Sequence, residues 1–539
     1  MAGAQSDTAT HCGEQRRHGA SHDVGGTRRH RDRSIAITVN PGPREAPSKG
    51  TRVTHADSRF IGPRAKLEIL DEDEIRRIHE ASLEVLSEVG IVYYSRRALD
   101  VLEEHGAQVD RETASAKLPP ALVEEALRTL PGRFVLGGRT REYDLPLDGE
   151  HAYVTSDGCA TFVREADGTV RDSTKRDVFD AARVVHGLAN ISATSALVSA
   201  QDSPIETRVL HEFDACMRAS AKHTFVVSIK EDWEARSLIR MAEAVAGGSK
   251  ELYERPTFSV ILGSVSPLHQ ERFGMDLAFT LAPAGIPLML YPMPILGATA
   301  PVTPAGAAVM TNAEVLGAVA AIQLAHPGAR LIHAGGPTSL FMRTGSYFAN
   351  VPEALLLRAA QAQMAAFYGL PAGLGWGGTK DKEPGAQAAY ENTLGLLLEF
   401  FAGADLLFGA GLLDSVQIMS LEELVIADET FGMVSRLLRG VTVDREELAV
   451  DLIAKMGFNG DYLFDAHTRK HVRELWRARL SETATYDSWV AAGRKTIARK
   501  ARARAEELLA APLPEADALP EELGREFDDI IATAAAGRH

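Results

Sequence analysis

The chain has 539 residues, of which 45% are hydrophobic and 24% are charged, and it carries a net charge of -15. These proportions are ordinary for a globular protein with a large core, and the length allows one large barrel or two to four domains. The acidic balance argues against nucleic acid as a partner, because phosphate backbones are bound by basic faces.

Cysteine usage and the lack of export signals both favour a reducing compartment. The three cysteines, Cys12, Cys159 and Cys216, form no CxxC pair, so neither a disulfide framework nor a structural zinc site is predicted. The N-terminus shows no signal-peptide core. The most apolar stretch, residues 277–302, is interrupted by five prolines and is not a membrane helix. We therefore expect a cytoplasmic protein with no membrane partner.

The first 170 residues divide into two parts. Residues 1–60 are rich in Arg, His, Gly and Ser, and we expect them to be disordered. An RNA-binding tail would need interleaved aromatics, which are lacking, so a solvated extension is favoured. Residues 61–170 form a second region. Apolar periodicity there predicts helices over 71–89, 96–105 and 119–130, followed by short strands over 133–170.

From residue 171 to 440, apolar strands alternate with amphipathic helices in cycles typical of βα units. This alternation favours a (β/α)₈ barrel of the α/β class over an open sheet. A strand in the 150s would complete the set of eight, and residues 441–539 are predicted to be a helical extension. The seven strands predicted in the repeat are 191–198, 224–229, 257–262, 287–292, 330–334, 371–376 and 405–409.

The segment 374–391 is the strongest pointer to a site. It reads as a strand end, a glycine-rich turn and a charged loop before a helix, and active sites of parallel barrels lie at such strand ends. Substrate-binding candidates gather there and at neighbouring strand ends: Tyr291, Phe341, Tyr347, Trp376, Gly377, Gly378, Thr379 and Gln387. The aromatic members suit a cage for a cation, but composition alone favours the alternative, ordinary packing of aromatics under barrel loops.

Two residues are candidates for catalysis. His333, near another strand end, is either a donor to the substrate or a satisfied structural group. Asp381 is either a base or a solvated loop carboxylate. No metal site is predicted, because His333 has no second histidine at metal-ligand spacing. A nucleophile elbow, a P-loop and a dinucleotide fingerprint are also lacking.

Four blocks carry a resemblance to a known family. The chain resembles the trimethylamine methyltransferase superfamily, in its branch without pyrrolysine, typified by glycine betaine methyltransferases. The resemblance covers about residues 65 to 515. The four blocks are IHEASLEVLSEVGI (78–91) with 98–107, GATAPVTPAG (297–306) with 312–316, MRTG (342–345) with 352–355, and KDKEPGAQAAYE (380–391).

The resemblance implies a (β/α)₈ barrel that moves a methyl group from an amine to the cobalt of a corrinoid. That corrinoid is carried by a separate, transiently bound protein, so no tightly bound cofactor is expected. Members that use trimethylamine carry pyrrolysine near the glycine-rich turn, whereas this chain has standard residues from Gly375 to Thr379. The expected substrate is therefore a quaternary amine. A barrel that binds such an amine without transferring methyl groups, or that runs another reaction, is the alternative.

Two further expectations concern assembly and the predicted cage. The size of the barrel favours a homo-oligomer. If the aromatic cage forms, replacing Trp376 by Ala should weaken the binding of a cationic substrate by about 1–2 kcal/mol.

Overall fold

In a computed structural model, residues 36–39, 65–375 and 378–537 are described. Eight parallel strands form a closed barrel in which each strand pairs with the next and the last, β21, pairs with the first, β8. The predicted (β/α)₈ fold is confirmed. The strands are β8 (Tyr153–Ser156), β11 (Ile191–Ser195), β12 (His223–Val226), β13 (Phe258–Val265), β15 (Leu288–Tyr291), β17 (Leu331–Gly335), β20 (Ala372–Gly375) and β21 (Leu406–Ala410).

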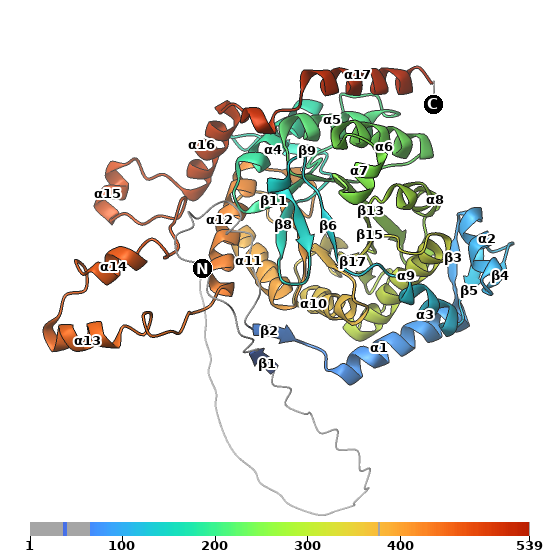
Figure 1. Cartoon of the computed structure of the whole chain (residues 1–539), viewed down its shortest axis with the longest axis horizontal. Helices are drawn as coiled ribbons and strands as arrows, with labels where there is room; N and C mark the ends of the chain where they lie inside the picture. The colour runs from blue at the N-terminus through green and yellow to red at the C-terminus, as the bar shows by residue number, and fades with distance from the viewer. Residues whose placement is uncertain (1–35, 40–64, 376–377, 538–539) are drawn as a thin grey trace, which may run out of the picture. The chain divides into compact units, whose positions relative to one another are not determined.

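Helices follow the strands and surround the barrel (Figure 1). The longest, α9, spans Pro304–Ala325 and is long and apolar enough to cross a membrane by composition alone. Most of it is buried against neighbouring helices, as expected for a core helix. The main surrounding helices are α4 (Lys175–Gly187), α5 (Arg208–Ala219), α6 (Asp232–Ala246), α8 (Arg272–Leu281), α9, α10 (Pro352–Phe367), α11 (Ala386–Phe401) and α12 (Leu421–Leu438).

The barrel strands divide their side chains between two cores. Successive residues of a strand point to opposite faces, so every second residue enters the barrel interior and the others meet the helices. Ile332 and Ala334 of β17 lie in the interior cluster, together with Met289, Phe225 and Phe408. The outward residues join two larger clusters between strands and helices. The interior is thus a packed core, and a ligand has room only at a barrel end.

The N-terminal region carries the predicted helices. Asp71 caps α1 (Glu72–Glu84) in a capping box, and a π-helical turn, Val85–Val89, extends it to Gly90. Gly90 has a φ of 87°, and a Cβ there would lie 2.7 Å from the Ala116 carbonyl oxygen, so glycine is required. The other two helices are α2 (Arg96–Glu104) and α3 (Pro120–Arg128), and the short strands are β3 (Ile91–Tyr93), β4 (Gln108–Asp110), β5 (Ser115–Lys117), β6 (Phe134–Leu136) and β7 (Leu145–Leu147).

Two boundaries differ from the sequence prediction. The first barrel strand, β8, is the strand expected in the 150s, and it lies before residue 171, where the barrel region was predicted to begin. Residues 36–39, inside the segment predicted to be disordered, form β1 (Ala36–Val39), which pairs antiparallel with β2 (Ala65–Glu68). The rest of residues 1–60, apart from this strand, lies outside the described residues.

The C-terminal extension is helical, as predicted. Helix α16 packs against α12 and α4, and α17 packs against α6 and α5. The three helices before them, by contrast, contain no buried residue. The helices of the extension are α13 (Val450–Met456), α14 (Ala466–His471), α15 (Tyr486–Ala491), α16 (Ile497–Ala510) and α17 (Glu521–Ala535).

Candidate active site

Two small sheets lie beyond the carboxyl ends of the barrel strands. One consists of β16 (Ile295–Leu296), β18 (Thr338–Phe341) and β19 (Ser346–Phe348), which belong to the loops after β15 and β17. The other contains β9 (Phe162–Arg164) and β10 (Val170–Asp172) from the loop after β8, and β22 (Leu412–Leu413) and β23 (Ile418–Met419) from the loop after β21. Together these sheets frame the mouth of the barrel.

Tyr291 enters this mouth from the end of β15. Its ring packs on the interior cluster, and its hydroxyl lies against two glycines of neighbouring strand ends. A Cβ on Gly336 would lie 2.7 Å from that hydroxyl oxygen, and a Cβ on Gly375 would lie closer still. Contacts this short are not available to real Cβ atoms, so both positions need glycine for the tyrosine to occupy its place. The glycines at the strand ends therefore make room for a side chain.

Tyr291 shares its surroundings with Asp157, Tyr347 and Arg358. Burial raises the pKa of the Tyr291 phenol well above its ordinary value, and the charges of Asp157 and Tyr347 raise it further, whereas Arg358 opposes the shift. Burial likewise raises the pKa of Tyr347, with Asp157 adding to the effect. Both phenols therefore stay protonated at neutral pH. Asp157 therefore lies near enough to both tyrosines to act on each of them electrostatically.

Asp157 directly follows β8 and was not among the residues predicted from the sequence. Burial raises the pKa of its carboxyl to about 6, against an opposing hydrogen bond from the Gly158 N–H, which donates to Asp157 Oδ1 at 2.8 Å. Its backbone carbonyl accepts a hydrogen bond from the Ser195 hydroxyl, which ties it to the end of β11. A carboxyl with a raised pKa at a strand end is a typical functional group of a barrel mouth.

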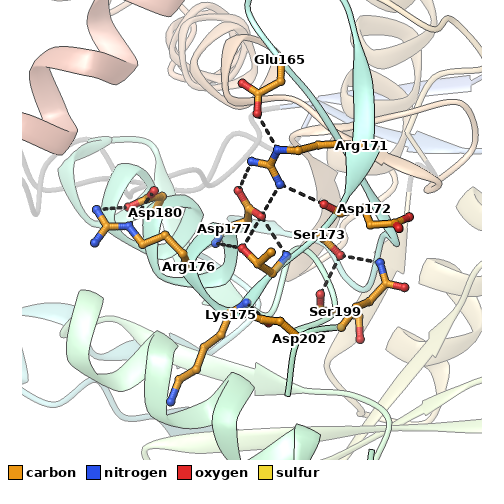
Figure 2. Close-up of polar contacts among 12 residues, drawn as sticks. Glu165, Arg171, Asp172, Ser173, Lys175, Arg176, Asp177, Asp180, Ser199 and Asp202 are labelled. Carbon is orange, nitrogen blue, oxygen red and sulfur yellow. Dashed lines mark hydrogen bonds and ion pairs between the residues drawn. The ribbon is translucent and has the colours of Figure 1, made fainter. Parts of the chain in front are cut away.

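The loop after Asp157 is held firmly at its far end (Figure 2). The Ser173 hydroxyl contacts the carbonyls of Thr161 at 3.1 Å and Ser199 at 2.7 Å, which joins the loops after β8 and β11. Arg171 donates two hydrogen bonds of 2.7 Å to Asp177, whose carboxylate also caps the start of α4. This bidentate pair fixes the loop geometry, and with it the backbone that presents Asp157.

A buried ion pair supports the glycine-rich turn from behind. Arg358 of α10 and Glu399 of α11 are fully buried and lie 2.6 Å apart, from Nε to Oε1. The same guanidinium donates to the Asn350 side-chain oxygen at 2.7 Å, and the Asn350 amide donates to the Gly378 carbonyl at 3.0 Å. This chain of contacts links two barrel helices to the turn that continues from β20.

Glu391 of α11 is the centre of a second network. Its Oε2 accepts hydrogen bonds from the Thr379 hydroxyl at 2.7 Å and the Lys380 N–H at 2.9 Å, and its Oε1 accepts from Gln387 at 2.8 Å. Asp381 joins through its N–H, which donates to the Thr379 hydroxyl at 2.9 Å. The structure therefore brings Thr379, Asp381 and Gln387 together, and their visible contacts anchor the loop 378–385 to α11.

Two of the predicted residues, His333 and Phe341, have other surroundings. His333 points outward from β17, stacks on Tyr368 at a centroid distance of 6.3 Å, and is shielded from solvent. Burial lowers the pKa of its imidazole to about 4, so it is neutral at physiological pH. Phe341 is 51% exposed at the end of β18 and packs into no cage. Trp376 and the neighbouring Gly377 lie outside the described residues.

Comparison with known proteins decides the family. The sequence profile of the family described as "Trimethylamine methyltransferase (MTTB)" matches residues 42–537, nearly the whole chain. The chain belongs to this family. Members of the trimethylamine methyltransferase family are corrinoid-dependent methyltransferases, and this chain is accordingly a methyltransferase.

Two sequence relatives and one solved structure align with most of this chain. A trimethylamine methyltransferase MttB of Desulfitobacterium hafniense (strain DSM 10664 / DCB-2) is 31% identical over 85% of this chain and 92% of its own. A glycine betaine methyltransferase of Desulfitobacterium hafniense (strain Y51) is 31% identical over 87% of this chain and 97% of its own. The crystal structure of the Methanosarcina barkeri monomethylamine methyltransferase (MtmB) aligns with a TM-score of 0.46 at 15% identity, covering 81% of this chain and 88% of that one.

Within the described part of the chain, no cluster with metal-ligand geometry lies at the barrel mouth. Over residues 36–39, 65–375 and 378–537, the one group of three side chains with such geometry is Glu447, His471 and Glu474, which lies in the C-terminal extension. Among the described residues at the mouth, the two tyrosines and Asp157 are available for chemistry. They can bind and orient a cation, because both phenols hold their protons and Asp157 is largely ionised at neutral pH.

Proposed function

We propose that this protein transfers an N-methyl group from a quaternary amine, such as glycine betaine, to the cobalt of a corrinoid carried by a separate protein. Family membership supports the reaction class, and the glycine betaine methyltransferase that covers most of this chain supports the substrate class. The observation that carries the proposal is the cluster of Tyr291, Tyr347 and Asp157 at the barrel mouth.

The cluster has the chemistry that a quaternary ammonium requires. Such an ion has no N–H to donate, so it is recognised by diffuse electrostatics rather than by hydrogen bonds. Ring faces attract it through their quadrupoles, and a nearby carboxylate attracts it directly. Tyr291 and Tyr347 supply the rings, and Asp157 supplies the negative charge near both. A neutral amine would gain little from this arrangement.

The reaction needs positioning more than acid–base chemistry. The cobalt(I) centre of the methyl acceptor supplies both electrons of the new Co–CH₃ bond, and the C–N electron pair leaves with nitrogen as a neutral tertiary amine. No proton has to move. The protein therefore contributes mainly by holding the N-methyl group toward the acceptor. Because positive charge leaves the nitrogen during transfer, the attraction of the cluster falls along the reaction, so tight ground-state binding alone gives no acceleration.

The turn after β20 supports a quaternary amine over trimethylamine. Family members that use trimethylamine are expected, from the resemblance, to carry pyrrolysine near this turn. Here the positions from Gly375 to Thr379 hold Gly, Trp, Gly, Gly and Thr. A quaternary amine already carries a neutral leaving group, so it needs no additional activating residue. We assign trimethylamine itself a minor role or none.

Methyl transfer to free cob(I)alamin tests the proposal. The full chain is incubated with reduced cobalamin and a panel of quaternary amines, and methylcobalamin is followed by its absorbance. We expect methylcobalamin and the demethylated amine in equal amounts for at least one quaternary amine, and none with trimethylamine. Turnover of trimethylamine alone, or no turnover across the panel with folded protein and fully reduced cobalt, would overturn it. Adding a cognate corrinoid protein should raise the rate.

A further inference from the structure

Residues 441–478, here called the arm, have no core of their own. None of the described residues in this segment is buried, and its helices α13 and α14 have only seven and six residues. Figure 1 shows both helices outside the ring of barrel helices. Helices this short are not stable in water without packing against something else. The arm therefore needs a surface to pack on.

The arm exposes an unusual amount of apolar surface. Eleven of its large apolar side chains are at least 41% exposed. At roughly 150 Å² for a fully exposed large side chain, they present about 1,000 Å² together, which exceeds the ~800 Å² that each partner contributes to a standard interface. These side chains are Val441, Val443, Leu448, Val450, Ile453, Phe458, Tyr462, Leu463, Phe464, Val472 and Leu475.

A second uncovered apolar surface lies on the same chain. Tyr390 and Leu394 of α11 are each 56% exposed, and Met433 and Leu437 of α12 are 46% and 64% exposed. The two helices pack side by side. These four residues, here called the α11–α12 face, lie on the side turned away from the barrel, where barrel helices are normally polar. Exposed large apolar side chains on two adjacent helices make this face a candidate interaction site.

We propose that the arm of one copy covers the α11–α12 face of a second copy, and that the exchange is reciprocal. One chain supplies both surfaces, and α12 leads directly into the arm, so a two-fold axis beside α12 brings each arm to the other copy's face. Charge also favours a second copy as the partner of the arm. The whole chain has a net charge of -15, but the arm holds seven acidic and six basic residues and is almost neutral. Contact through the arm therefore avoids most of the electrostatic repulsion between two copies.

The direction of α12 argues against the corrinoid protein as the occupant. Because α12 follows β21, it begins at the barrel mouth and ends near the opposite end of the strands. The arm starts there. A corrinoid partner has to reach the mouth, where Tyr291 lies, so the arm leaves from the wrong end to receive it. The proposed exchange does not depend on the methyl-transfer function.

Sedimentation and light scattering of the full chain test the exchange. We expect wild type to be a dimer, or a closed assembly of dimers, at micromolar concentration. Phe458→Asp with Phe464→Asp in the arm, and Met433→Asp with Leu437→Asp on the face, should each reduce the assembly to half its size or weaken association at least 100-fold. Mixing the two variants leaves one intact arm–face pair and should restore mixed dimers. Ile205→Asp, at an exposed apolar residue outside both surfaces, should leave the assembly unchanged.

Cross-linking identifies the covered surface even if a variant misfolds. A photoreactive phenylalanine at position 458 is introduced into a mixture of isotopically light and heavy chains. We expect mixed light–heavy cross-links to peptides of α11 or α12. A monomeric wild type, variants that associate as wild type does, or cross-links confined to one chain or to another surface would each overturn the proposal. Retained methyl transfer in a dissociated variant would leave the proposed function standing, because the two tests read different properties.

Discussion

The hydroxyl of Tyr291 lies directly over the α-carbon of Gly375, at a distance that no side chain on residue 375 would permit. Gly375 ends β20, one strand beyond β17 and two beyond β15. A tyrosine can therefore reach across the mouth only because the intervening strand ends carry Gly336 and Gly375. Gly375, the first glycine of the glycine-rich turn, is thus explained by the position of one aromatic side chain.

Replacing Gly375 by Ala should displace Tyr291. The added methyl group and the phenol oxygen cannot both keep their places, and overpacking of this kind costs about 1–3 kcal/mol of stability. We expect affinity for a quaternary amine to fall about 10-fold or more, measured by calorimetry, with a lower unfolding temperature. Gly274→Ala is the matched control, since Gly274 lies in the surrounding helix α8 and a Cβ there meets only the Gly263 carbonyl oxygen, at 3.6 Å. Wild-type affinity in Gly375→Ala would show that Tyr291 does not contact the substrate.

Amine binding should depend on pH through Asp157. Burial raises the pKa of this carboxyl to about 6, so its negative charge is present above pH 6 and lost below it. A cationic substrate should therefore bind more weakly at pH 5 than at pH 8. Loss of one charge contact of about 1–2 kcal/mol corresponds to about 5–30-fold in affinity. Titration calorimetry with a substrate that keeps its charge over this range, such as choline, measures the effect, and a flat profile would contradict it.

Asp157→Asn should weaken binding and stabilise the free protein. Because the folded-state pKa lies above the ordinary value of 3.8, ionisation of Asp157 opposes folding. Its penalty is absent at pH 4 and complete above pH 6. The variant should therefore match wild type near pH 4 and exceed it at pH 8 by on the order of 1–3 kcal/mol. Asp172→Asn, at an exposed carboxylate nearby, should change neither property.

The barrel was predictable because its strands and helices carry regular apolar patterns, but the direction of one key side chain was not. His333 pairs with Leu290 across β15 and β17, and paired residues of adjacent strands point to the same face. Leu290 packs outward, so His333 does too, while Tyr291 points inward. The face that His333 occupies is set by its pairing with Leu290, which lies 43 positions earlier in the sequence. The apolar pattern within one strand does not reveal this register.

Asp157 was missed for a different reason. It follows a strand of only four residues, inside a segment that looks like a set of small hairpins, so its place at a barrel strand end had no local signal. The expected eighth strand in the 150s was the available clue, because any polar residue directly after it would face the mouth. Arg358 and Glu399 were equally hidden, since they lie on different helices and meet only in the folded barrel.

Glu391→Gln should loosen the loop 378–385 more than it destabilises the whole protein. The carboxylate accepts hydrogen bonds at both oxygens from Thr379, Lys380 and Gln387, and an amide would turn a donor toward one of these donors. An unmatched buried pair of this kind costs about 1–3 kcal/mol. We expect a lower kcat/KM and faster amide exchange in the loop. Glu383→Gln, in the same loop but 72% exposed, is the control and should behave as wild type.

Variants of the buried pair Arg358 and Glu399 can separate its effect on the stability of the protein from its effect on the position of the turn after β20. Glu399→Gln leaves a fully buried guanidinium without its counter-charge and should cost about 3–5 kcal/mol in unfolding free energy. Replacing both residues by Leu should recover most of that loss, because neither buried charge remains. The double variant still lacks the guanidinium that holds Asn350, and through it the Gly378 carbonyl, so activity should stay low while stability returns. If activity returned with stability, Arg358 would serve only the core, and the turn after β20 would be positioned by Glu391 alone.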